Sequence, residues 1–369
     1  MLKKFTVENY RSFEKPITLD FTVKYDFGLN EKKIKADLLD KIVIYGPNAS
    51  GKTNLGYALF DIVGLLTDKQ LVPQDDSAFI NADSGKEKAV FTYEFKVGED
   101  IITYCYKKSS PKKLTYESLT VNEKSIFTYD FEKEKGTFEH MNLIGAESLN
   151  FEYFGNNLAL LRFIANNTKQ ESNSPIRFIM NFVTHMLWFR SLQNNGYIGL
   201  MNGIHSINDW LIDNEYVADF QDFLKEFAGV ERNLNGYKLP QEPSLLVEMH
   251  KHAFLTFSKV ASSGTHALKC FYYWSKRFNE VSLLYMDEFD AFYHFDLARN
   301  VLQYVIGFDN LQAVLTTHDP YLASNDILRP DAYFMLRDGK LVSFPDSTER
   351  EIKPGHSLDK MLRNGEFDG

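Results

Sequence analysis

Gly46-Pro47-Asn48-Ala49-Ser50-Gly51-Lys52-Thr53 stands between a β-branched run over residues 41–45 (KIVIY) and a stretch of helical apolar spacing that begins at Thr53. This is the GxxxxGK[ST] pattern of a phosphate-binding loop, or P-loop, in its usual strand-and-helix setting. Its glycines let the backbone curl so that successive N–H groups point at a phosphate. We expect Lys52 to reach the β- and γ-phosphates of a nucleotide and the Thr53 hydroxyl to ligate Mg²⁺. The stretch therefore predicts an α/β fold of the P-loop NTPase class.

A second strand pattern, over residues 281–286, ends in the two acids Asp287 and Glu288. A carboxylate pair at the end of a buried strand is costly unless a positive group lies beside it, and Mg²⁺ with a nucleotide supplies that charge. We expect Asp287 to hold the metal through water, and Glu288 to orient and deprotonate the attacking water. Taken alone, such a pair is equally typical of the start of a solvated loop, so the P-loop is what favours the catalytic interpretation.

A third apolar strand, over residues 311–317, ends in Thr317-His318-Asp319. A single histidine is more often structural than functional. His318 nevertheless follows the same kind of strand end as Glu288, so we expect both side chains at one edge of the sheet. There His318 could contact the γ-phosphate.

Residues 259–268 (KVASSGTHAL) place two serines and a glycine where a strand pattern ends and an apolar helix begins. Ser262, Ser263 and Gly264 would present free backbone N–H groups and the positive end of a helix dipole to an anion. A simple helix cap explains the same residues on local grounds.

Together these segments resemble the ABC-type ATPase head, and within that class the branch of RecF, the OLD nucleases and the chromosome-maintenance (SMC-like) proteins. GPNASGKT is similar to the Walker A motif of that branch, and FTVENYRSF resembles its opening strand. LLYMDEFDAFYH resembles its Walker B motif and D-loop, with Asp287, Glu288 and Asp290 in the matching places. LTTHD is similar to the segment of its switch histidine, which is His318 here. The resemblance covers roughly residues 1–66 and 255–337.

The resemblance also gives residues 262–264 a role. ASSGT is similar to the family's signature motif, with Ser262 and Gly264 at the phosphate-contacting positions and Ser263 in place of a glycine. In that family the signature motif caps the γ-phosphate bound at the P-loop of a second subunit. The resemblance therefore implies ATP and Mg²⁺ as cofactors, ATP hydrolysis, and a homodimer or higher homo-oligomer with shared composite sites.

Parts of the family pattern are not evident. Gln74 and Gln193 are candidates for the Q-loop glutamine by identity alone, and no long heptad-bearing arm separates the motifs. The missing arm argues against a chromosome-tethering machine. The basic run over residues 107–113 (KKSSPKK) predicts a hairpin tip, which is either a solvated turn or a contact to a phosphate backbone or partner.

The chain divides by pattern into four parts. Residues 1–66 form the N-terminal half of the ATPase core, with a hairpin around residues 11–13. Residues 67–154 predict an antiparallel β subdomain, and residues 155–240 a helical insertion with helices over 175–192 and 216–228. Residues 241–369 form the C-terminal half of the core, with strands over 244–250 and 253–260 before the signature segment. Strand and helix alternation at both ends of the chain indicates one α/β core built from the two termini.

Composition excludes several classes of protein. The formal net charge is −9, so no general attraction to nucleic acid or to an acidic membrane is expected, although a local nucleic-acid contact stays open. Only two cysteines are present, without a CxxC pair, which fits a reduced, cytoplasmic setting. No apolar run reaches the length of a membrane span, and the first residues lack the apolar core of a secretory signal.

The hypothesis that fits these observations is a Mg²⁺-dependent ATPase that acts as sensor or gate for a separate effector protein in a phage-defence system. That last step is an analogy with small members of the family that lack arms and a nuclease domain. A DNA-repair ATPase like RecF and a non-hydrolysing ATP-bound scaffold remain as alternatives. Glu288 argues against the scaffold, and the negative charge argues mildly against the DNA-loading protein.

Overall fold

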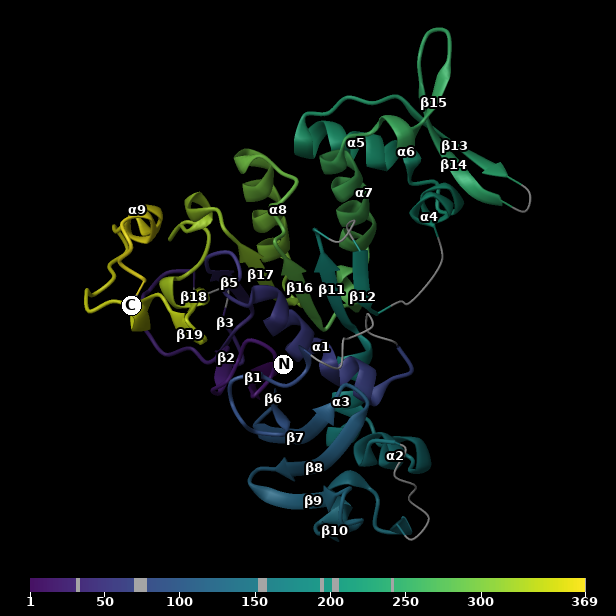
Figure 1. Cartoon of the computed structure of the whole chain (residues 1–369). Helices are drawn as coiled ribbons and strands as arrows, with labels where there is room; N and C mark the ends of the chain where they lie inside the picture. The colour runs from purple at the N-terminus through teal and green to yellow at the C-terminus, as the bar shows by residue number, and fades with distance from the viewer. Residues whose placement is uncertain are drawn as a thin grey trace.

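The computed structural model describes residues 1–30, 34–69, 78–151, 158–192, 196–200, 206–239 and 242–368. Two seven-stranded sheets form the body of the described part, with helices packed on and between them (Figure 1). Figure 1 also shows a smaller three-stranded sheet that projects from this body, and the two chain ends.

The central sheet carries the motifs. Its strand order is β12-β11-β16-β17-β5-β18-β19, in which the five inner strands are parallel and the two edge strands are antiparallel. The strands are β5 (Lys41–Tyr45), β11 (Met186–Arg190), β12 (Gly196–Gly199), β16 (Leu283–Asp287), β17 (Gln312–Thr317), β18 (Tyr333–Arg337) and β19 (Lys340–Ser343).

Both faces of this sheet are covered, which explains why its strands read as continuous apolar runs. Every residue of β5, β11, β16 and β17 is buried. Parallel strands need long crossover connections, and the helices in those connections supply the cover. The helices α1 (Lys52–Leu66), α7 (Ser263–Ser275) and α8 (Phe295–Gly307) all contribute apolar side chains to the core. The expected P-loop α/β fold is thus confirmed.

The second sheet is antiparallel and uses both early and later strands. Its order is β10-β9-β8-β7-β6-β1-β2, so the expected N-terminal hairpin joins the strands expected after residue 89. The strands are β1 (Leu2–Glu8), β2 (Ile17–Asp20), β6 (Ala89–Val97), β7 (Asp100–Ser110), β8 (Lys113–Val121), β9 (Lys124–Asp130) and β10 (Lys135–Phe138). The sheet takes strands from both sides of residue 66, and the expected boundaries at residues 66, 154 and 240 stay predictions.

A buried polar cluster ties α1 to this second sheet. Lys108 Nζ donates to both carboxylate oxygens of Asp61, at 2.9 and 3.0 Å, and the Tyr106 hydroxyl donates to Asp61 Oδ2 at 2.9 Å. The Tyr93 hydroxyl donates to the carbonyl oxygen of Ala58 at 3.1 Å. Lys108, one of the four lysines in the basic run, is therefore a buried partner of the P-loop helix and not part of an exposed tip.

Helix α2 (Leu160–Asn167) is anchored by a carboxylate from the same sheet. Glu117, fully buried in β8, accepts hydrogen bonds from the N–H groups of Leu160 and Leu161 at 2.6 and 2.8 Å, and from the Tyr104 hydroxyl at 2.9 Å. Burial raises the pKa of Glu117 to about 7, although these three hydrogen bonds favour the ionised form.

This raised pKa predicts a pH-dependent stability. Because the folded state binds the proton more tightly than the unfolded chain, the contribution of Glu117 is fully present below its unfolded pKa and is lost as pH rises toward 7. We expect the free energy of unfolding to fall by about 3 kcal/mol over this interval, relative to the Glu117→Gln variant. Denaturant titrations of both proteins between pH 5 and pH 8 measure the difference. A difference that does not change with pH would contradict the shifted pKa.

The helix expected over residues 175–192 is wrong in its second half. Helix α3 covers Pro175–Thr184, and the chain then enters β11. The run MLWFR is buried on all sides because it forms an inner strand of the central sheet, between β12 and β16. A fully buried strand has no period-2 alternation, so its pattern could not be told from a continuing helix. The expected helical insertion therefore also contributes two strands, β11 and β12, to the central sheet.

The remaining elements surround the small sheet β13-β14-β15. The expected helix over 216–228 is confirmed as α5 (Val217–Ala228). The strand expected over 253–260 is half correct, because β15 ends at Thr256 and a one-turn helix α6 (Phe257–Val260) follows. The other elements here are α4 (Ile207–Asp213), β13 (Leu234–Leu239) and β14 (Glu242–Met249); β3 (Ile34–Lys35), β4 (Leu38–Leu39) and α9 (Leu358–Arg363) lie elsewhere in the chain.

Among the described residues, no helix combines the length and the apolar character that crossing a membrane requires.

Candidate functional site

Three motif-bearing strands end side by side. β16, β17 and β5 are neighbours and run parallel, so their carboxyl ends share one edge of the central sheet. β5 leads into the P-loop over residues 46–53, β16 into Asp287 and Glu288, and β17 into His318. The structure thus brings these segments together, as the sequence indicated.

The P-loop backbone explains its glycines. Gly51 has φ 105°, in the left-handed region, and a Cβ atom there would lie 2.9 Å from Ser12 Oγ in the N-terminal hairpin. A Cβ atom at Gly46 would lie 2.4 Å from the carbonyl oxygen of Leu336, which comes from the neighbouring strand β18. Ala49 also has a positive φ, of 63°. The loop is therefore tightly wound and wedged between two parts of the chain that are distant in sequence.

Lys52 folds back over this loop. Its Nζ donates to the carbonyl oxygens of Gly46 at 2.9 Å and Pro47 at 3.2 Å, and it lies 2.9 Å from Nε2 of His318. Only 4% of Lys52 is exposed. Burial lowers the pKa of Lys52, and the negative charge of Glu288 opposes that shift. The ammonium thus occupies the centre of the loop with no carboxylate in direct contact in the described part of the chain.

Two groups compete for one nitrogen of His318. Besides Lys52, the carboxylate oxygen Oε1 of Glu288 lies 3.2 Å from His318 Nε2. An ammonium only donates and a carboxylate only accepts, so Nε2 must be unprotonated to accept from Lys52 and protonated to donate to Glu288. A ligand that draws Lys52 toward itself therefore frees His318 to orient Glu288.

Asp287 is held by two hydroxyl groups. Thr53 Oγ1 donates to Asp287 Oδ2 at 2.8 Å, and Thr316 Oγ1 donates to Oδ1 at 2.9 Å. Burial raises the pKa of Asp287, and these two hydrogen bonds oppose the shift. The Thr316 hydroxyl also accepts from the N–H of Glu288 at 2.8 Å. Glu288 itself has φ 47°, and strained backbone of this kind gathers at functional sites.

Asp290 belongs to the turn that follows. Thr317 Oγ1 donates to Asp290 Oδ2 at 2.7 Å, and burial raises the pKa of Asp290. This contact fixes the turn after Glu288 against the end of β17.

The donor set suits Mg²⁺ in the company of a nucleotide. Thr53 and Asp287 offer one hydroxyl and one carboxylate, which are the hard oxygen donors that Mg²⁺ takes. Within the described ranges, no group of three or more His, Cys, Asp or Glu side chains could hold a metal ion. Mg²⁺ commonly uses one or two protein ligands and completes its shell with water and phosphate oxygens. Thr53 and Asp287 would therefore hold the ion only together with a phosphate.

The loop also fits a phosphate. The first turn of α1, beginning at Lys52, leaves N–H groups without intrahelical partners and carries the positive end of the helix dipole. Ser50 Oγ is buried and has no hydrogen-bond partner among the described residues. Pro47, Asn48 and Ala49 are exposed. The P-loop is thus a polar cradle whose outer rim faces solvent.

The signature segment, residues 262–264, begins α7 at a distance from this cradle along the fold (Figure 1). The Ser262 side chain caps the helix by accepting from the N–H of Thr265 at 3.2 Å. Ser262 and Ser263 are exposed, and a Cβ atom at Gly264 would lie 2.9 Å from the carbonyl oxygen of Phe292. No hydrogen bond or ion pair recorded for the described residues joins this segment to the P-loop of the same chain.

Comparison with known proteins identifies the family. The family model described as "AAA domain, putative AbiEii toxin, Type IV TA system" matches residues 41–324, which is well over half of the chain. The chain belongs to this family. The match spans the P-loop, Asp287, Glu288 and His318, and so confirms the resemblance to P-loop ATPase heads. No curated protein matches the sequence.

Solved structures similar to this AAA domain include heads of SMC proteins. One is an SMC head bound to the C-terminal winged-helix domain of ScpA, with 16% identity, 98% of this chain and 99% of that chain covered, and a TM-score of 0.48. Another is the SMC head domain from Thermotoga maritima, with 13% identity, coverage of 92% and 97%, and a TM-score of 0.43. A third, derived from Pyrococcus furiosus, has an extended coiled coil and is bound to the C-terminal domain of ScpA, with 13% identity, 98% coverage of both chains and a TM-score of 0.46.

Sequence reasoning missed two residues of the site. Thr316 bridges Asp287 and the backbone of Glu288, and the pair of threonines before His318 was the available signal. Arg190 was hidden inside the expected helix over 175–192, although it ends β11 beside Asp287. The Q-loop candidates Gln74 and Gln193 both lie outside the described residues.

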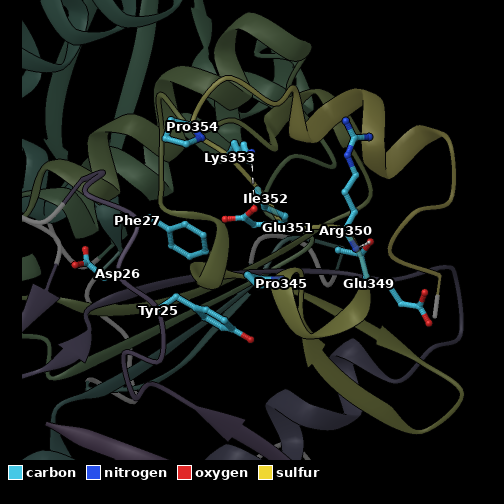
Figure 2. Close-up of a pocket in the computed structure, with 11 residues that line it drawn as sticks. Tyr25, Asp26, Phe27, Pro345, Glu349, Arg350, Glu351, Ile352, Lys353 and Pro354 are labelled. Carbon is cyan, nitrogen blue, oxygen red and sulfur yellow. Dashed lines mark hydrogen bonds and ion pairs between the residues drawn. The ribbon is translucent and has the colours of Figure 1, made fainter.

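A pocket of about 430 Å³ lies away from this site (Figure 2). It is lined by residues 25–27 and 348–354 together with Pro345, and none of the motif residues borders it. Acidic and basic side chains both line it. Lys353 Nζ, for example, lies 3.8 Å from Glu351 Oε2. This pocket shares no residue with the P-loop site and has no part in the chemistry that follows.

Proposed function

We propose that this AAA domain hydrolyses ATP with Mg²⁺ in a homodimer with shared composite sites, and that it serves as the sensor or gate of a phage-defence system with a separate effector protein. The observation that carries the ATPase part is the convergence of Lys52, Asp287, Glu288 and His318 at one edge of the central sheet. The description of the matched family, a putative toxin of a type IV toxin–antitoxin system, supports a role in defence.

The side chains divide the chemistry among them. Lys52 and the N–H groups of the P-loop bind the phosphates, and Thr53 with Asp287 would hold Mg²⁺, whose charge offsets that of the phosphates. Glu288 orients a water molecule and accepts its proton, because its carboxylate stands at the rim of the site, where its one side-chain contact within the described part of the chain is His318. His318 positions Glu288 once Lys52 has turned toward the phosphates.

A second copy of the chain would complete the site. The rim of the P-loop and residues 262–263 are both exposed, and each presents N–H groups suited to an anion. A twofold dimer would pair the P-loop of each subunit with the signature segment of the other, which makes two equivalent sites. The chain has only two cysteines, Cys105 and Cys270, which agrees with action in the reducing cytoplasm.

Phosphate release tests the ATPase activity directly. We expect the purified protein to release inorganic phosphate from ATP with Mg²⁺, and we expect EDTA to reduce the rate to background, because Thr53 and Asp287 offer no replacement for the charge of the metal. Adding excess Mg²⁺ after EDTA should restore the rate. Release that is equally fast in EDTA would contradict the proposed role of the metal, and no release with Mg²⁺ would contradict hydrolysis.

A further inference from the structure

Arg190 is a buried cation at the same edge of the sheet. It is the last residue of β11 and pairs in parallel register with Asp287 on β16. Neighbouring residues in register project to the same face of a sheet, so both side chains lie on the side of α1. Only 4% of Arg190 is exposed. Along this edge the order is the P-loop, His318, Asp287 and then Arg190.

Two aromatic rings hold the guanidinium in place. Its central carbon lies 5.0 Å from the ring centre of Tyr57 and 5.0 Å from that of Trp188. One terminal nitrogen donates to the Tyr57 hydroxyl. Tyr57 follows Thr53 by four residues and so shares its face of α1. Thr53 contacts Asp287, and Tyr57, one turn later, contacts Arg190. Arg190 therefore lies against the first turns of α1, next to the P-loop.

The charge of Arg190 is not offset by any carboxylate of the described residues. In the described part of the chain no Asp or Glu lies within ion-pair distance of it, and its Nε is buried without an acceptor. The two oxygens of Asp287 accept from hydroxyl groups instead. A second cation, Arg11, lies 4.6 Å from the ring centre of Tyr57, which adds positive charge at the same place.

Two other buried cations of this chain, Arg329 and Lys108, have carboxylate partners. Arg329 Nε lies 2.8 Å from a carboxylate oxygen of Asp331, and Lys108 Nζ lies 2.9 Å from Asp61. A buried charge without a partner destabilises the folded state, so a buried cation that no carboxylate offsets is a candidate for binding an anionic ligand. Arg190 therefore differs from Arg329 and Lys108 in having no carboxylate partner among the described residues.

We propose that Arg190 is a further anion-binding residue of the nucleotide site, and that its anion is the terminal phosphate of bound ATP. This inference rests on the proposed ATP binding. It is supported by the place of Arg190 beside Asp287, on the side away from the P-loop strand. The planar fork of a guanidinium matches the geometry of phosphate oxygens, and its free Nε offers a donor.

The test compares Arg190→Met and Arg190→Lys with the parent, all carrying Glu288→Gln so that ATP stays intact. Met keeps the apolar length of the side chain and removes the charge. We expect the ligand-free melting temperature of Arg190→Met to equal or exceed that of the parent, because an unpaired buried charge is removed. We expect its affinity for ATP to fall roughly tenfold to a hundredfold and its affinity for ADP to change by less than about twofold. The affinity of Arg190→Lys for ATP should lie between that of the parent and that of Arg190→Met.

A purely structural role predicts the reverse pattern. An Arg190→Met protein that melts well below the parent, or fails to fold, while Arg190→Lys binds ATP as tightly as the parent, would overturn the inference. Equal weakening for ATP and ADP would overturn the assignment to the terminal phosphate. The affinity of the Glu288→Gln parent for ATP tests the proposed ATP binding by itself. The Arg190 variants are compared with that parent, so a failure of the proposed function is distinguished from a failure of this inference.

Discussion

Lys52→Ala and Glu288→Gln are both expected to abolish ATP turnover, by different routes. Lys52→Ala removes the ammonium at the centre of the P-loop, so nucleotide affinity and rate both fall, the rate by a factor of roughly 100 or more. Glu288→Gln keeps the shape of the side chain and removes its basicity, so ATP binds and stays, while the rate falls by a factor of roughly 100 to 10,000.

Nucleotide affinity and phosphate release, measured on the same preparations, separate the two effects. Lys340→Ala and Glu349→Gln are matched controls, because both residues are exposed and lie outside the site. Both controls should behave as wild type. Normal hydrolysis by Glu288→Gln would show that this carboxylate is not the base, and normal ATP affinity of Lys52→Ala would remove the P-loop from nucleotide binding.

The second large effect concerns the signature segment. If residues 262–264 cap the partner's phosphate, Ser263→Asp places a carboxylate against that phosphate, and like-charge repulsion blocks closure of the site. The homodimer should then lose turnover while it still binds ATP through its own P-loop. Ser263 suits this test because it is exposed, whereas any side chain at Gly264 would also crowd the carbonyl oxygen of Phe292. The control is Ser263→Asn, because asparagine has the size of aspartate without its charge. This variant should retain turnover.

Mixing two inactive proteins tests whether the sites are shared. When Ser263→Asp and Lys52→Ala subunits exchange, half of the dimers are mixed, and each mixed dimer has one site with both defects and one with none. Isologous pairing then predicts recovery of roughly a quarter of wild-type turnover if the two sites act independently. Turnover by the mixture, followed during subunit exchange, measures the recovery. A Ser263→Asp protein that turns over ATP at the wild-type rate would show that this segment is only a helix cap.

The residues of the candidate nucleotide site were predictable because their patterns are local. The P-loop carries its own spacing, and residues 283–287 and 312–317 are short apolar runs that end in polar side chains. Parallel strands end at a common edge, so placing Glu288 and His318 together followed from the order of the elements. The family match spans all of these segments.

The features that the sequence did not predict depend on contacts between residues that are distant along the chain. The run MLWFR fits a helix pattern because burial on both faces erases strand periodicity, and the predicted helix conceals Arg190 as a strand end. The joining of β1 to β6 needs pairing over a long sequence separation, such as that of Phe5 with Tyr93, which no local pattern encodes. The expected hairpin tip is present, with Lys112 and Lys113 exposed at the turn between β7 and β8. The contact of Lys108 with Asp61 removes only this lysine from the tip, because α1 covers that part of the strand.

The position of β5 in the central sheet has a consequence for biosynthesis. β5 is made early, yet its neighbours β17 and β18 begin at Gln312 and Tyr333. β1 also depends on the last third of the chain. The Gln312 side chain accepts a hydrogen bond from the N–H of Leu2 at 2.9 Å and donates one to its carbonyl oxygen at 2.7 Å.

At ordinary translation rates, β5 waits on the order of tens of seconds for these partners. Throughout that time β5 is a β-branched strand whose N–H and C=O groups have no partner strand. Such a strand can pair with other chains, which is a usual origin of aggregation during synthesis. Holding chaperones should therefore matter more for making this protein than for keeping it folded. A nascent chain that stops before residue 312 contains every residue of the P-loop and none of the strands between which β5 is inserted.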